Sequence, residues 1–246
     1  MKLVLGYLLS PGFYIIFGFF LAFFHIIQWI SLKLGGYNAH KKSVDALNFC
    51  LTYSTLFLFN PPRLINKYTL PLNRPIIFVS NHQSSFDIPG LIYFLRKHHG
   101  KFISKIELVK ARIPSISINL KYGGGANIDR KDSEQSKQEI GKLAQNMKTK
   151  NWSAFIFPEG TRTKDGKMKD FQVGGMATLI SQVPDVLIIP VAINGSYSMT
   201  RKGMFPLLPF NKMTWEVLRP IETAGKDIVA LVKEAENAIR QKVKEY

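Results

Sequence analysis

The chain has 246 residues, 46% hydrophobic and 20% charged, so it holds enough apolar material for one folded domain and is neither disordered nor fibrous. Its 33 Lys and Arg residues against 17 Asp and Glu residues give a formal net charge of +16, which favours an anionic partner. The single cysteine, Cys50, excludes an internal disulfide framework and thiolate metal clusters, and it indicates a reducing compartment.

The first 60 residues have the composition of membrane segments. No Asp, Glu, Lys or Arg occurs from Leu3 to Leu32, and a helix from Pro11 to Ile30 would be about 30 Å long, enough to cross the hydrocarbon layer. A second apolar stretch, Val44 to Phe59, is shorter and contains polar residues, which indicates a re-entrant or interfacial segment. We expect a two-helix hairpin that dips into one leaflet without necessarily spanning the bilayer. The residues between the helices form a basic patch suited to anionic headgroups: Lys33, His40, Lys41 and Lys42.

The alternative for this region is a cleaved signal peptide followed by a buried core helix. The apolar run is longer than a signal core, only Lys2 precedes it, and no small-residue cleavage motif follows it. We therefore favour membrane-anchoring helices over residues 1–60 and a separate folded body over residues 61–246, joined by a linker from Asn60 to Pro71.

The body alternates short apolar runs with amphipathic ones, which is typical of an α/β fold. We expect strands at Pro75–Ser80, Lys101–Ser104, Ala126–Ile128, Ser153–Phe157, Val186–Ile193 and Met213–Leu218. We expect helices at Ile88–Lys97, Asp132–Met147, Gly174–Gln182 and Ile228–Val243.

The first chemical signal is the segment Asn81–Asp87 (NHQSSFD), where a predicted strand passes into a predicted helix. Sites in α/β proteins form at the ends of strands. There, Asp87 can contact one ring nitrogen of His82 and orient the imidazole, while the other nitrogen takes a proton from an alcohol. The alternative is that Asp87 only caps the helix and His82 is an ordinary turn residue.

The second signal is Phe157–Thr163 (FPEGTRT), directly after another predicted strand. Its glycine lets a substrate approach the backbone, and Arg162 can hold a phosphate through two parallel hydrogen bonds. By itself, this segment is also compatible with an ordinary turn that carries a solvated arginine.

Two further blocks, Gly125–Arg130 and Ile189–Gly195, complete a pattern of four. In this order, the blocks closely resemble the glycerolipid acyltransferase family, in particular its 1-acyl-sn-glycerol-3-phosphate (lysophosphatidic acid) acyltransferases. The resemblance covers most of the chain. It implies a single α/β acyltransferase domain, with a central mixed sheet flanked by helices, behind the N-terminal hydrophobic membrane hairpin.

The resemblance implies transfer of a fatty acyl group from an acyl-coenzyme A or acyl-carrier-protein thioester to the 2-hydroxyl of lysophosphatidic acid. The product would be phosphatidic acid, made in phospholipid biosynthesis. His82 would be the general base and Asp87 would orient it, with no covalent intermediate.

The same resemblance assigns the substrate-binding residues. Basic side chains would hold the substrate phosphate, a glutamate would position the site, and backbone N–H groups near Gly160 would stabilise the tetrahedral oxyanion. The implied residues are Lys105, Arg130, Glu159, Gly160, Thr161 and Arg162.

Two classes of alternative remain open at this point. A related acyltransferase could use glycerol-3-phosphate or another lysophospholipid as acceptor, and a non-enzymatic basic membrane-binding module would also explain the charge. No Gly-x-Ser-x-Gly elbow is present, which argues against a serine hydrolase. The charged run Lys131–Lys150 contains residues of both signs, so we expect no nucleic-acid partner.

We also expect no resident cofactor and no metal, because no nucleotide-binding fingerprint or metal-ligand set is present. The expected partners are lysophosphatidic acid, membrane lipid and the acyl donor. The expected location is a membrane, with the active site on its cytoplasmic face.

Overall fold

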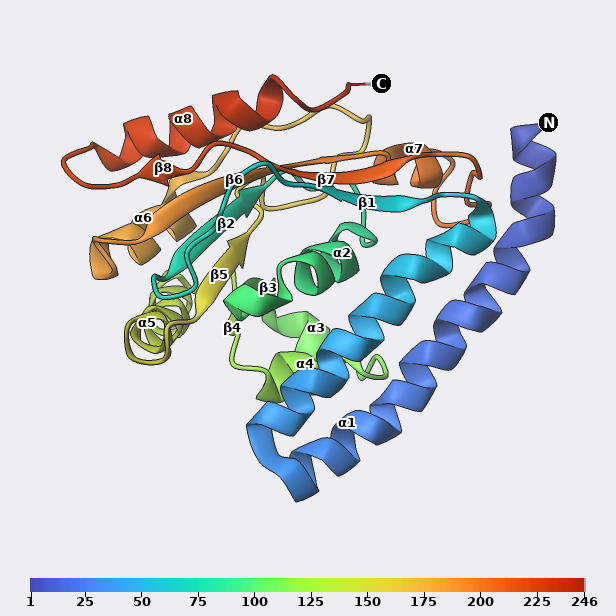
Figure 1. The fold of residues 1–246 in the computed structure, drawn as a ribbon, viewed down its shortest axis with the longest axis horizontal. Coiled ribbons are helices and arrows are strands. Elements are labelled where there is room, and N and C mark those ends of the chain that lie inside the picture. Colours follow the sequence, from blue (N-terminus) through green and yellow to red (C-terminus); the bar gives the residue numbers. More distant parts are fainter. Residues whose placement is uncertain (246) are drawn as a thin grey trace.

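The computed structural model describes residues 1–245, which are built around an eight-stranded mixed sheet (Figure 1). The strand order is β1-β7-β6-β2-β5-β3-β4, and β8 pairs with β6. The strands are β1 (Pro62–Ile65), β2 (Ile76–Ser80), β3 (Gly100–Lys105), β4 (Ala126–Ile128), β5 (Ser153–Ile156), β6 (Leu187–Asn194), β7 (Met213–Val217) and β8 (Ile221–Glu222).

The direction of the strands places several chain segments at one edge. Strands β2, β3, β4, β5 and β6 pair in parallel with their neighbours in this group, whereas β7 and β8 run antiparallel to β6 and β1 runs parallel to β7. The five parallel strands therefore end on the same side of the sheet, which we call the carboxyl edge. The polypeptide that follows each of these strands begins there, as expected for a site in an α/β protein.

Helices cover both faces of the sheet. The helices after the hairpin are α2 (Asp87–Phe94), α3 (Ile106–Lys110), α4 (Ile116–Tyr122), α5 (Ser133–Lys150), α6 (Val173–Gln182), α7 (Ser196–Thr200) and α8 (Ile228–Arg240), with 3₁₀ turns η1 (Thr55–Leu58) and η2 (Arg96–His98).

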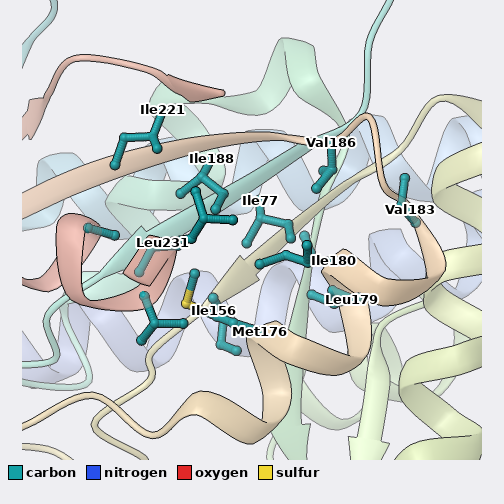
Figure 2. Packing of buried hydrophobic residues seen from close by; sticks show 14 of the residues in the cluster. Ile77, Ile156, Met176, Leu179, Ile180, Val183, Val186, Ile188, Ile221 and Leu231 are labelled. Carbon is teal, nitrogen blue, oxygen red and sulfur yellow. The ribbon is translucent and has the colours of Figure 1, made fainter. Parts of the chain in front are cut away.

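Two hydrophobic cores lie on opposite faces of the sheet. Side chains of α5, α6 and α8 pack against one face (Figure 2), and α1 and α2 pack against the other. Strand β2 contributes Ile77 and Val79 to the first core and Ile76 and Phe78 to the second. All five of its residues are buried, as expected for a strand with both faces covered.

The N-terminal hairpin is the helix α1 (Lys2–Ser54) with a break at Gly36. At this residue φ is 64° and ψ is −158°, which is non-helical and open to glycine because it has no Cβ. The chain reverses there, and the second arm returns toward the sheet (Figure 1). Within residues 1–245, this is the one helix long and apolar enough, by length and composition, to cross a membrane.

The expected fold class is confirmed, but the hairpin and the linker differ from expectation in detail. Both arms are longer than predicted, with Pro11 inside the first arm and residues 33–42 helical except at Gly36. The predicted linker Asn60–Pro71 contains β1, which pairs with β7. Pro62 is compatible with this strand because β1 is an edge strand, and the outer side of an edge strand does not need the backbone N–H that proline lacks.

Some of the predicted basic patch faces the protein. His40 is 1% exposed, and Lys41 Nζ contacts the Asp45 carboxylate and donates to the Arg96 carbonyl at 2.8 Å. Only Lys33 and Lys42 of the four predicted cations are exposed. The prediction that His40 and Lys41 face lipid headgroups was wrong, because both lie on the face of the second arm that packs against the body.

Candidate active site

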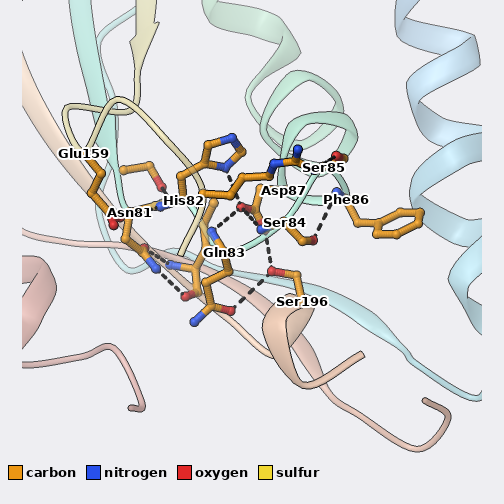
Figure 3. Close-up of polar contacts among 12 residues, drawn as sticks. Asn81, His82, Gln83, Ser84, Ser85, Phe86, Asp87, Glu159 and Ser196 are labelled. Carbon is orange, nitrogen blue, oxygen red and sulfur yellow. Dashed lines mark hydrogen bonds and ion pairs between the residues drawn. The ribbon is translucent and has the colours of Figure 1, made fainter. Parts of the chain in front are cut away.

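The segment after β2 brings His82 and Asp87 into direct contact at the carboxyl edge. Their separation is 2.9 Å between Nδ1 of the ring and Oδ2 of the carboxylate (Figure 3). The Asp87 side chain is fully buried, whereas that of His82 is 14% exposed. This contact places the proton on Nδ1 and leaves the Nε2 lone pair as an acceptor. Within residues 1–245, Nε2 has no hydrogen-bond partner.

The buried carboxylate of Asp87 is surrounded by donors. The backbone N–H groups of Gln83 and Ser84 donate to Oδ2 at 2.7 and 2.8 Å, and the Ser196 hydroxyl donates to Oδ1 (Figure 3). Trp215 Nε1 donates at 3.0 Å to the Asp87 carbonyl. The donors to Oδ1 and Oδ2 fix the carboxylate in one orientation and satisfy a charge that would otherwise be costly to bury, while the Trp215 indole holds the backbone of the same residue.

Two further contacts fix the histidine. Its ring stacks on Phe157, with 3.9 Å between the ring centroids and 9° between the planes. Asn81, directly before it, pairs with the backbone of Ile193 in β6 through its amide group at 2.7 and 2.9 Å. The strand pairing of β2 and β6 is thus prolonged up to the residue before His82.

Glu159 ties the two main sequence blocks together. Its Oε1 accepts the N–H of His82 at 2.7 Å, and its Oε2 accepts the N–H of Lys169 at 3.0 Å. The N–H of Thr163 donates back to the His82 carbonyl at 2.9 Å. Burial raises the pKa of Glu159, while the two backbone donors oppose that rise. Glu159 therefore holds the backbone of His82, and its carboxylate makes no hydrogen bond to the ring in the described part of the chain.

The predicted phosphate-binding arginines lie beside this turn. Arg162 is exposed and donates through Nη1 to the Ser85 hydroxyl at 2.7 Å, so it reaches across to the turn after His82. Arg130, which follows β4, places Nη1 4.0 Å from the position that a Cβ on Gly160 would occupy. Both guanidinium groups are therefore at the carboxyl edge.

Two further cations belong to the same edge. Lys105 is exposed at the end of β3, paired in register with Ile128. Lys169, which the sequence analysis did not select, donates through Nζ to the Thr161 hydroxyl at 2.7 Å. The Thr161 side chain therefore lies beside the ammonium of Lys169.

The backbone N–H of Gly160 is already hydrogen-bonded within the turn. The N–H of Gly160 donates to the Phe157 carbonyl at 3.0 Å, so it closes the turn instead of facing a substrate. Within residues 1–245, the backbone N–H groups of Thr161 and Arg162 have no partner. These two groups are the candidates among the N–H groups near Gly160 that were expected to stabilise the oxyanion.

The structure adds Ser196 and Trp215 to the residues around Asp87. Ser196 directly follows the fourth sequence block, Ile189–Gly195, and its position after a predicted strand was the available signal. Trp215 lies in the middle of β7, and its indole contact to Asp87 spans 128 residues of sequence. No pattern of neighbouring residues in the sequence indicates the contact between Trp215 and Asp87.

A family model described as Acyltransferase matches residues 62–194, which include three complete blocks and most of the fourth. The chain belongs to the Acyltransferase family. The resemblance found from the sequence blocks is therefore confirmed.

Several curated proteins are similar to this chain over part of their length. The chain is 29% identical over 216 residues to human 1-acyl-sn-glycerol-3-phosphate acyltransferase beta, covering 85% of this chain and 73% of that protein. It is 31% identical over 167 residues to the chloroplastic 1-acyl-sn-glycerol-3-phosphate acyltransferase BAT2 of Brassica napus, covering 68% of this chain and 46% of that protein. The chain thus spans less than half the length of this plant relative.

A solved structure matches nearly the whole chain. The crystal structure of the 1-acyl-sn-glycerophosphate acyltransferase PlsC from Thermotoga maritima covers 99% of this chain and 96% of its own, with a TM-score of 0.79 and 25% identity. Because the match extends over both the hairpin and the sheet, the two proteins share the complete architecture.

Proposed function

We propose that this protein transfers an acyl group from a thioester to the 2-hydroxyl of 1-acyl-sn-glycerol-3-phosphate, giving phosphatidic acid. The observation that carries the proposal is the His82–Asp87 contact at the same sheet edge as Arg130 and Arg162. The acceptor carries a hydroxyl and a phosphate on one molecule. It therefore requires a base that takes the hydroxyl proton and, close by, cations that bind the phosphate. The names of the similar human, plant and bacterial proteins support the same acceptor.

The reaction needs one proton to move twice. Nε2 of His82 takes the proton from the acceptor hydroxyl as the oxygen attacks the thioester carbonyl carbon. The tetrahedral intermediate then collapses, the carbon–sulfur bond breaks, and the protonated imidazole returns the proton to the leaving thiolate. Asp87 stabilises the imidazolium between these steps and holds the ring in the productive tautomer.

The donors at the turn have separate tasks. Arg162 and Arg130 hold the phosphate of the acceptor, with Lys105 and Lys169 adding positive potential around it. The free N–H groups of Thr161 and Arg162 face the oxyanion, where one such donor typically contributes roughly 3 to 4 kcal/mol. Within residues 1–245, no group of three His, Cys, Asp or Glu side chains is placed to hold a metal ion.

The donor is proposed to be an acyl-coenzyme A or an acyl carrier protein. Both carry a thioester and negative charge, and the net charge of +16 favours either one. The protein is proposed to work on a membrane surface with the active site facing the cytoplasm. The apolar α1 and the free thiol of Cys50 support that location.

The test is a direct assay of the purified full chain. Lysophosphatidic acid is supplied with either acyl-coenzyme A or acyl carrier protein thioester, and glycerol-3-phosphate and lysophosphatidylcholine are competing acceptors. Phosphatidate formation that is lost in His82→Ala, with the fold intact by circular dichroism, supports the proposal. Preference for another acceptor would identify a related acyltransferase, and full function of His82→Ala would identify a membrane-binding module; either result contradicts the proposal.

A further inference from the structure

The segment between α7 and β7 exposes large apolar side chains to solvent. Met204, Phe205 and Phe210 are 48%, 51% and 47% exposed. Phe59, which follows η1, is 56% exposed and stacks on Phe210 with 5.1 Å between the ring centroids. We call these four side chains the rim patch. An aromatic cluster of this kind on a folded surface marks an interaction site.

In the segment that carries the rim patch, several backbone groups are paired with other protein groups. Two of its residues, Pro206 and Pro209, have no N–H to satisfy. A segment with few free backbone groups can enter a layer that contains little water. The pairs are Leu207 N to Ser10 Oγ (2.8 Å), Leu208 N to Met199 O (2.8 Å), Phe210 N to Leu58 O (3.2 Å), Asn60 Nδ2 to Leu208 O (3.0 Å) and the Tyr14 hydroxyl to Met204 O.

The rim patch is continuous with the hairpin. A Cβ on Gly6 would lie 2.7 Å from the Leu207 carbonyl oxygen, so the absence of a side chain lets the first arm approach the loop closely. Tyr7 contacts Phe205 edge to face at 5.6 Å. From there the exposed apolar side chains continue along the first arm: Val4, Leu8, Ile15, Phe19, Phe23, Ile26, Ile30 and Leu34.

The charges around the rim patch have one sign. The chain from Ser196 to Trp215 contains no Asp or Glu, and its cations Arg201, Lys202 and Lys212 are exposed. Basic residues next to aromatic ones are the pattern of a surface that binds anionic lipid headgroups. An acidic protein surface or a second copy of this cationic chain would fit the apolar part of the patch less well.

The rim patch also lies at the carboxyl edge of the sheet. The loop leads into β7, where Thr214 pairs with Asn194, the last residue of β6. The first arm meanwhile contacts the body along its length, through Ser10 at the loop and through His25, whose Nδ1 accepts the Ser115 N–H at 3.0 Å. A helix held to the body at both points lies beside it and does not leave it to cross a bilayer.

We propose that the rim patch is a second membrane-insertion surface, which seats the carboxyl edge on an anionic bilayer while α1 lies along the interface. This inference rests on the membrane association in the proposed function. It adds a second contact point, separate from the hairpin stripe, which fixes the tilt of the catalytic body.

The test uses tryptophan quenching by lipids brominated near the headgroup, in vesicles of phosphatidylcholine and phosphatidylglycerol. Native Trp29, in the first arm, reports on the hairpin, while Trp152 and Trp215 are buried and give a constant background. Phe205→Trp reports on the rim patch. Val229→Trp, an exposed position on α8, is the matched control. We expect quenching of the tryptophan introduced at position 205, by about half, and none of that introduced at position 229.

The outcomes separate the two proposals. Quenching of Trp29 without quenching at position 205 would overturn the rim patch and leave the hairpin as the membrane contact. If neither Trp29 nor the tryptophan at position 205 is quenched, membrane association is overturned as well. Neither result bears on acyl transfer, which is measured separately in detergent micelles.

A second variant excludes a contact between copies. Phe205→Ser combined with Phe210→Ser should keep its melting temperature and its activity in micelles, but bind phosphatidylglycerol vesicles about tenfold more weakly. If the wild-type protein is instead a dimer in micelles by light scattering and the double variant is a monomer, the rim patch is an interface between copies and the inference is wrong.

Discussion

The hydroxyl of Ser196, the first residue of α7, donates a hydrogen bond to Oδ1 of Asp87, while the opposite oxygen of that carboxylate faces His82 (Figure 3). The serine also contacts Gln83 Oε1 at 3.2 Å. Ser196 therefore contacts the carboxylate that orients His82, the proposed general base, without touching the imidazole itself.

Replacing this serine should weaken catalysis more than binding. Ser196→Ala leaves a fully buried carboxylate oxygen without its donor, a loss that typically costs about 1 to 3 kcal/mol. We expect kcat to fall about tenfold with KM for the acceptor nearly unchanged, and Ser196→Thr to restore most of kcat. Steady-state kinetics of the three proteins measures this. Equal losses in both variants would mean that the site needs the shape of serine and not its hydroxyl.

Arg162 should act mainly on acceptor binding. Removing a charge-assisted hydrogen bond to phosphate typically costs about 1.5 to 3 kcal/mol, so Arg162→Ala should raise KM for lysophosphatidic acid about 10- to 100-fold. Arg162→Lys should recover only part of this, because lysine cannot form the paired contact.

Two comparisons sharpen that prediction. Lys105→Ala, at the exposed end of β3, should raise the same KM only a few-fold, since a single exposed charge contributes little. Lys148→Ala, at the exposed end of α5, is the control and should change nothing. A larger effect from Lys105 than from Arg162 would move the phosphate site toward β3 and β4.

Glu159 should matter for both folding and rate. It accepts two backbone N–H groups, and Glu159→Gln turns one of the accepting oxygens into an NH2 group that faces a donor. We expect the free energy of unfolding to fall by about 1 to 3 kcal/mol, and kcat to fall because the His82 backbone loses its partner. Chemical denaturation in micelles and initial rates measure the two effects. An unchanged kcat would show that Thr163 alone holds His82.

Lys101 should make stability depend on pH. Burial lowers its pKa to about 7, with Lys41 adding to the shift and Asp45 opposing it. Its ammonium lies over the rings of Tyr37 and Trp152 at 5.0 and 4.8 Å from the centroids.

The sign of the pH effect follows from proton binding. Between pH 7 and the ordinary lysine value of 10.5, the unfolded chain holds a proton that the folded chain releases. Stability therefore rises with pH across that window, by at most about 1.4 kcal/mol per unit. The contribution of Lys101 is lowest below pH 7, where both the folded and the unfolded chain hold the proton. Lys101→Met should remove this rise, whereas Lys148→Met should keep it. Urea unfolding in micelles at pH 7.5 and 9 tests the difference, and parallel slopes for the wild type and Lys101→Met would contradict it.

The residues nearest to the chemistry could be predicted because their relationship is local. His82 and Asp87 are five residues apart at the junction of a strand and a helix, so ordinary backbone geometry brings them together. The Phe157–Thr163 turn follows a strand that is parallel to β2, which places it at the same edge. Hydrophobic patterning was sufficient for these parts of the fold.

The parts that sequence reasoning missed depend on contacts between distant residues. The bond from Ser196 to Asp87 spans 109 residues, and no short-range pattern encodes it. Strand β1 was missed because one proline precedes it and a second is its first residue, and because its partner β7 lies about 150 positions further along the chain. The short helices α3, α4 and α7 have too few turns to show a periodic apolar face.

The direct passage from the hairpin into β1 has a kinetic consequence. Only η1 and three residues separate the second arm from the first residue of that strand, so no flexible tether lies between the proposed membrane anchor and the sheet that carries His82. On a vesicle, the catalytic body of such an enzyme cannot move away from its anchor to meet substrate. It depends on acceptor lipids that reach it by lateral diffusion in the bilayer. Its turnover should then follow the mole fraction of acceptor in the surface, and dilution of that surface with inert lipid should slow it even when the total acceptor concentration is held constant.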